Sequence, residues 1–164
     1  MNKKLTGLIM LLLVIVSTTL FYGFKSVPDT NLVSEPTAKE KSEKFEKLKK
    51  DFDMSVSEIT TKPVISKSEA IKIAKPYVNG ITYKTKVKAF HVKLTDKRIA
   101  IGGFISQEAA DANPKLKGKQ YPEDVSVWLV TYEGIHALAS RGAIITETNV
   151  VIDDVTGKML YGFN

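Results

Sequence analysis

Cysteine is absent from the 164 residues of this chain. The absence excludes a disulfide, a thiolate nucleophile, a cysteine-ligated zinc ion and a lipid attached through cysteine. Any attachment to a membrane must therefore come from the peptide itself. Hydrophobic residues make up 43% of the chain and charged residues 26%, a composition that predicts a folded domain rather than a disordered chain.

Residue patterns typical of catalysis and cofactor binding are also absent. The chain has only two histidines, His91 and His136, and Ser140 near the second lies in no G-x-S-x-G turn. The pair Gly102-Gly103 has no GxGxxG or Walker context, and Asp153-Asp154 lacks the alternating ligands of an EF-hand. We therefore predict no enzyme activity and no catalytic, cofactor-binding or metal-binding residue, and we leave the binding residues unassigned.

The strongest positive signal is an apolar run over residues 5–24 that follows Lys3 and Lys4. About twenty residues at about 1.5 Å each match a hydrocarbon core of about 30 Å. The two lysines outweigh the lone Lys25, so the positive-inside rule places the C-terminal domain outside the cytoplasm. We predict an uncleaved signal anchor over residues 1–25; the alternative is cleavage near 17–19 and secretion.

Charge gives a weaker signal. The chain carries a formal +6, and its first 25 residues hold three lysines and no acid, which leaves +3 for the remainder. These remaining lysines are interleaved with Asp and Glu rather than clustered. The sequence therefore predicts no nucleic acid partner, because there is no basic patch with interleaved aromatic residues.

Residues 26–62 have the composition of a polar stalk that contains a charged helix. Pro28, Pro36 and scattered small polar residues indicate a flexible stalk. Residues 38–53 have Glu-before-Lys pairs at i,i+4 and a narrow apolar stripe, which together predict a helix. Two interpretations remain open: a helix that associates with a partner or a second copy, and a spacer helix whose apolar residues dock on its own domain. The stripe consists of Phe45, Leu48 and Phe52.

Residues 63–164 have the pattern of one α+β domain. Ser66 and Glu69 form a capping-box pattern, which predicts a helix with Asn79-Gly80 as its stop. Pro76 lies inside this stretch, and it either kinks the last turn or ends the helix near Ala74. Alternating and apolar runs predict strands after it. They cover residues 86–94, 99–105, 125–133, 144–153 and 158–163, with a turn at 154–157, a short helix at 107–113, and loops at 106–124 and 134–143.

Trp128 lies in the clearest strand, where both faces are apolar. A strand that is apolar on both faces is usually central in its sheet. We therefore expect Trp128 to pack in the core against the helix that begins at Ser66, rather than to act as a ligand platform.

Three segments resemble the PepSY-type domains. They are the helix from Ile65 to Ala74, the strand Trp128-Leu129-Val130-Thr131-Tyr132, and the terminal Asp153-x-x-Thr156-Gly157 hairpin; the resemblance covers residues 63–164. It implies a helix packed on an antiparallel sheet, in domains of peptidase propeptides and of secreted or membrane-anchored Gram-positive proteins that modulate peptidases or other envelope hydrolases by binding. The chain departs from the short form of that pattern at 102–124 and 134–143, and it has no peptidase domain of its own.

The sequence thus predicts an N-terminal helix packed on an antiparallel sheet, preceded by a charged stalk and a single transmembrane helix. The expected function is a non-enzymatic extracytoplasmic binding or regulatory module with a protein partner in the cell envelope. The alternatives are a structural spacer or tether that contacts anionic envelope polymers, and an envelope hydrolase. The patterns predict no cofactor and leave the oligomeric state open.

Overall fold

The computed structural model describes residues 32–139 and 142–164, within one compact unit that runs from Asn31 to Asn164. None of the helices in these two ranges is long and apolar enough to cross a membrane. The anchor predicted over residues 1–25 lies outside the described residues.

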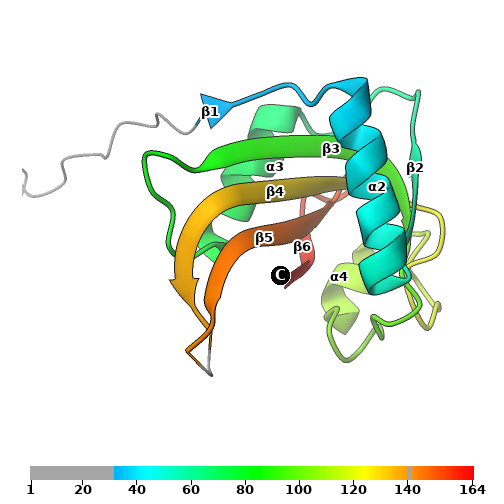
Figure 1. The fold of residues 1–164 in the computed structure, drawn as a ribbon. Helices are drawn as coiled ribbons and strands as arrows, with labels where there is room; N and C mark the ends of the chain where they lie inside the picture. Colours follow the sequence, from blue (N-terminus) through cyan, green and yellow to red (C-terminus); the bar gives the residue numbers. More distant parts are fainter. Residues whose placement is uncertain (1–31, 140–141) are drawn as a thin grey trace, which may run out of the picture. The chain divides into compact units, whose positions relative to one another are not determined.

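The centre of the domain is a six-stranded sheet in the order β1-β3-β4-β5-β6, with β2 pairing on β3 as well (Figure 1). All pairs are antiparallel except the short parallel pair of β1 with β3. The α+β class with an antiparallel sheet is therefore confirmed. The strands are β1 (Leu32–Val33), β2 (Ser55–Glu58), β3 (Lys86–Thr95), β4 (Val125–Leu138), β5 (Ile144–Asp153) and β6 (Met159–Phe163).

Helices cover both faces of this sheet. The helix α3 (Lys67–Ala74) packs on one face together with Trp128 and Tyr132. The helices α2 (Ala38–Phe52) and α4 (Gln107–Ala112) pack on the other face, in a second apolar cluster. Each face thus has its own core, because β4 presents apolar side chains to both sides.

The start and end of α3 follow from local chemistry. The hydroxyl of Ser66 accepts a hydrogen bond from the amide of Glu69 at the N-cap. At the other end the chain continues as the short 3-10 helix η1 (Lys75–Tyr77), which contains Pro76. The indole of Trp128 is only 6% exposed and donates a hydrogen bond to the carbonyl of Ile65 at 3.1 Å. Its predicted core position against this helix is confirmed.

The charged helix α2 docks on the sheet rather than standing apart from it. Thr37 and Glu40 form a complete capping box at its start. Leu48 is 1% exposed, and Phe45 and Phe52 pack against the same core. Of the two interpretations of this helix, docking on its own domain is the one observed, so the compact unit includes part of the segment assigned to the stalk.

The strand predicted over residues 99–105 is wrong. This stretch is a tight turn closed by a bridge between Ile101 and Ile105, and the φ angle of Gly102 is +84° within it. Ile105 is fully buried, so its apolar character reflects packing of the turn on the core. The predicted short helix in the 106–124 segment is confirmed as α4.

The loop predicted over residues 134–143 is also largely wrong. β4 continues to Leu138, and β5 starts at Ile144 as predicted. The register shifts between Glu133 and Ala137, and the φ angle of Gly134 is +74° at this irregularity. Gly134 thus marks an irregularity within β4 and does not end the strand.

Candidate functional site

A gap in the sheet edge formed by β3 is the best candidate for a binding site. β1 pairs with β3 only at residues 86–87, and β2 pairs with it only at residues 92–95. Residues 88–91 of β3 therefore have no strand partner on this edge within the described part of the chain. An unpaired stretch of a sheet edge is a template for pairing with another chain.

Proline explains where the first strand stops. The amide of Ser34 donates to the carbonyl of Val87 at 3.2 Å, which fixes the parallel ladder. The next donor in this ladder would be two residues on, where Pro36 has no N–H to give. Because alternate residues of a strand point their peptide groups to the same edge, Ala89 presents its amide and carbonyl here.

A cavity of about 220 Å³ lies at this gap. Ligand pockets for drug-sized molecules usually measure about 300–1,000 Å³. The cavity is therefore suited to one or two side chains of a larger partner, and we call it the edge slot. Its lining combines residues 35–36, 41, 45, 58–59 and 67 with residues 89–92 of β3 and Trp128.

Two ion pairs join the segments that line the edge slot. Lys67 of α3 contacts Glu35 at 2.6 Å, and Lys41 of α2 contacts Glu58 at 3.5 Å. Both glutamates are mostly exposed, at 85% and 66% of their side chains. Exposed pairs of this kind contribute about 0–1 kcal/mol, so a partner could replace them at little cost.

His91 lines the edge slot and belongs to a polar cluster beside it. Its Nε2 lies 3.0 Å from the hydroxyl of Ser126 and 3.1 Å from Oδ2 of Asp154, and the same hydroxyl donates to that carboxylate at 3.0 Å. In a Ser-His-Asp triad the serine and the aspartate contact opposite ring nitrogens. Here both contact Nε2, so the imidazole is not held between the two groups as a general base for serine that aspartate orients from the opposite nitrogen.

The other oxygen of Asp154 has a structural role. It accepts hydrogen bonds from the amides of Val64 and Ile65, at 3.0 and 3.4 Å. These contacts tie the chain before α3 to the turn between β5 and β6. The cluster therefore fixes the position of His91 and of one wall of the slot, which is what a preorganised binding surface needs.

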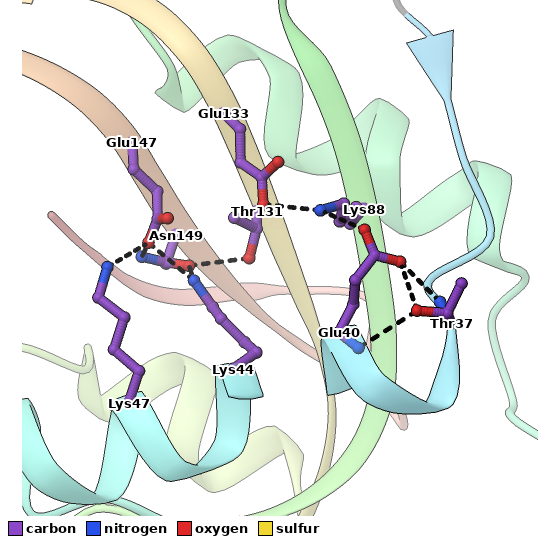
Figure 2. Close-up of polar contacts among 9 residues, drawn as sticks. All are labelled: Thr37, Glu40, Lys44, Lys47, Lys88, Thr131, Glu133, Glu147 and Asn149. Atoms are coloured by element: carbon purple, nitrogen blue, oxygen red, sulfur yellow. Dashed lines mark hydrogen bonds and ion pairs between the residues drawn. The ribbon is translucent and has the colours of Figure 1, made fainter. Parts of the chain in front are cut away.

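A second polar cluster holds α2 against the sheet (Figure 2). The ammonium of Lys44 donates to Glu147 and to Asn149, both at 2.8 Å, and Asn149 also accepts from the hydroxyl of Thr131 at 2.8 Å. Burial lowers the pKa of Lys44 despite the attraction of Glu147. Burial opposes ionisation of Glu147, yet its bonds to Lys44 and Asn149 outweigh this and lower its pKa.

Lys88 continues this network next to the slot. It contacts Glu133 and Glu40, each at 3.0 Å, from the β3 residue adjacent to Ala89. The backbone amide of Thr37 and the Lys88 ammonium lower the pKa of Glu40 to about 2. The folded pKa values of Glu40 and Glu147 are lower than that of an ordinary glutamate. Their contribution to the docking of α2 is therefore fully present at pH values above the ordinary glutamate pKa, and it is lost as the pH falls through the lowered values.

Apart from the contact between His91 and Asp154, the residues considered in the sequence for catalysis or metal binding do not come together in one site within the described residues. His136 is exposed on β4, away from His91 on β3, and Asp153 and Asp154 stabilise turns. In residues 32–139 and 142–164 no group of three or more His, Asp or Glu is placed to hold a metal ion. The slot itself was missed, and its one signal in the sequence is Pro36 soon after a short apolar pair.

The chain matches no protein-family model, no curated protein and no solved structure.

Proposed function

We propose that this protein is a non-enzymatic extracytoplasmic binding module, anchored to the cell membrane by residues 5–24, that recognises an extended segment of an envelope protein. A regulated peptidase or hydrolase of the envelope is the partner class that the resemblance to PepSY-type domains implies. The observation that carries the proposal is the edge slot, an interruption in strand pairing with a cavity beside it.

Main-chain pairing is the mode of recognition that fits this geometry. An extended peptide can add to a free sheet edge, where backbone hydrogen bonds supply affinity and side-chain pockets supply specificity. In the edge slot, Ala89 offers the backbone groups and the cavity offers room for one or two side chains. A backbone N–H from the partner, next to Ala89, would supply the donor that Pro36 lacks and so extend the ladder.

The distribution of charge favours this mode over a tether for anionic polymers. Many lysines of the described domain already pair with acids, including Lys44, Lys67, Lys88 and Lys93. A paired lysine contributes less to a continuous basic surface than an unpaired one. A tether would instead bind with strong salt dependence.

Site-specific photocrosslinking tests the proposal. A photoreactive amino acid replaces Ile59, which lines the slot, in the full-length chain. The variant is expressed in cells of the native host, and crosslinking is carried out in their membranes. We expect one discrete crosslinked protein, with the crosslink mapped to an extended segment of that protein by peptide mass spectrometry. The matched control carries the same photoreactive group at Val155, which is 46% exposed in the β5–β6 turn, and should give no such product.

Salt separates the competing function from the proposed one. Retention on envelope polymers that is lost as ionic strength rises, with equal crosslinking from both positions, would contradict recognition at the slot and favour the tether. A discrete product from Ile59 that persists at high salt would support the proposal, because backbone pairing is less screened than exposed charge pairs.

A further inference from the structure

We propose that the end of the domain that carries β1 rests on the lipid surface, with exposed tyrosine and aliphatic side chains at the headgroup level and lysines against anionic lipid. This inference rests on the membrane anchor of the proposed function. It goes beyond that function because it assigns a second binding surface and its ligand class, distinct from the edge slot.

The topology brings several segments to this end, which we call the β1 end. Leu32 pairs with Lys86 at the start of β3, and Lys86 pairs with Glu133 of β4. β4 then continues past this point to Leu138, which pairs with Ile144 at the start of β5. Figure 1 shows β1 and the β4–β5 hairpin on the left, whereas α2, β2 and α4 lie toward the right.

The loop before β3 and the end of η1 join the same region. The amide of His136 donates to the carbonyl of Gly80 at 3.0 Å, which places the loop of residues 79–85 along β4. Tyr77 and Leu138 line one shared hollow of about 630 Å³. The side chains of η1, of this loop and of the hairpin therefore form one surface.

That surface is rich in exposed apolar and aromatic groups. Tyr83 is 77% exposed, Leu138 81%, Ile144 63% and Tyr77 55%. Tyrosine favours the water–lipid boundary, because its ring is apolar and its hydroxyl is polar. Exposed aliphatic residues grouped with it are typical of interaction surfaces rather than of ordinary solvated surface.

Charge at the β1 end is complementary to anionic lipid. Lys84 and Lys86 are exposed beside these side chains, and the Lys84 ammonium lies 5.5 Å from the ring centre of Tyr83. The nearby carboxylates of Glu133 and Glu147 are paired with lysines of the network under α2. Each lysine near an anionic surface contributes about a fivefold gain in binding.

Chain length sets the reach of the domain from the membrane. The apolar run ends at residue 24 and β1 begins at Leu32, so residues 25–31 join them. Seven residues span at most about 25 Å when fully extended. The first residue of the domain is thus held within that distance of the bilayer, and the surface next to it is the β1 end.

The absence of cysteine makes the test direct, because a single introduced cysteine gives one label per chain. A polarity-sensitive fluorophore is attached to Tyr83→Cys and to Leu138→Cys in the full-length chain, reconstituted in vesicles of equal parts phosphatidylglycerol and phosphatidylcholine. We expect a blue-shifted, brighter emission that lipid-borne quenchers reduce. The matched controls are Phe104→Cys and Val155→Cys, also at exposed apolar positions, which should report water.

Flotation of the same vesicles separates the two proposals. If the chain floats with the vesicles but all four labels report water, the lipid contact is overturned and the anchor stands. If the chain does not float, the anchor and the contact that rests on it are both overturned. If the chain floats and the labels at Tyr83 and Leu138 report lipid, the double variant Lys84→Gln with Lys86→Gln tests the role of charge. In vesicles with phosphatidylglycerol this variant should lower the fraction of chains whose labels report lipid. An unchanged fraction would contradict the electrostatic part of the proposal.

Discussion

Replacing Gly80 by alanine should destabilise the domain by more than about 4 kcal/mol, a large part of the 5–15 kcal/mol of a typical domain. The φ angle of Gly80 is +72°, and a Cβ built there would lie 2.3 Å from the carbonyl oxygen of His136. That oxygen belongs to the backbone of β4, so relief requires the strand or the loop to move. Thermal or urea unfolding of the full-length variant measures the loss.

A matched control separates this clash from the cost of left-handed backbone. The φ angle of Gly118 is +74°, and no atom lies within 4 Å of a Cβ built there. Gly118→Ala should therefore cost only about 1–2 kcal/mol. Equal losses at the two positions would mean that the loop before β3 does not pack on β4 as described.

Replacing Asp153 by alanine should cost about 3 kcal/mol. Its side chain is fully buried and accepts three hydrogen bonds. The donors are the side-chain amide of Asn113 at 2.8 Å, the backbone amide of Val155 and the hydroxyl of Thr156. Truncation leaves the buried side-chain amide of Asn113 without its acceptor and removes two further hydrogen bonds that hold the turn. The change in unfolding free energy is again the measured quantity.

Asp111→Ala is the control for this second prediction. Asp111 is exposed on α4 and accepts one hydrogen bond from the side chain of Gln107. Its removal should change stability by less than about 0.5 kcal/mol. A loss at Asp153 no larger than this would show that the Asp-x-x-Thr-Gly turn does not depend on its buried carboxylate.

Local patterns in the sequence predicted those elements whose structure is decided locally. The cap at Ser66, the break in the helix at Pro76 and the turn closed by Gly157, whose φ angle is +68°, depend on residues within a few positions of each other. The sequence left open whether Pro76 kinks the helix or ends it, and in the structure α3 ends at Ala74. Alternating residues likewise predicted β3, and the turn at 154–157 predicted the strands β5 and β6 on either side of it. The position of Trp128 followed from a strand that is apolar on both faces.

The features that the sequence did not predict depend on contacts between residues distant in the chain. The burial of Ile105 and the continuation of β4 past Gly134 are decided by packing partners that the local pattern does not show. The edge slot arises because two strands from either side of α2 meet β3 at different places. No local pattern reports such a register, although Pro36 accounts for it once the pairing is known.

Amide hydrogen exchange along β3 of the full-length chain tests most directly whether the edge slot is open to a partner. Lys88 and Phe90 direct their amides to β4, whereas Ala89 directs its amide into the slot. If the slot is open, the amide of Ala89 exchanges faster than those of both neighbours, by on the order of a hundredfold or more. Equal protection of all three amides would show that this edge is already filled and would contradict recognition at the slot.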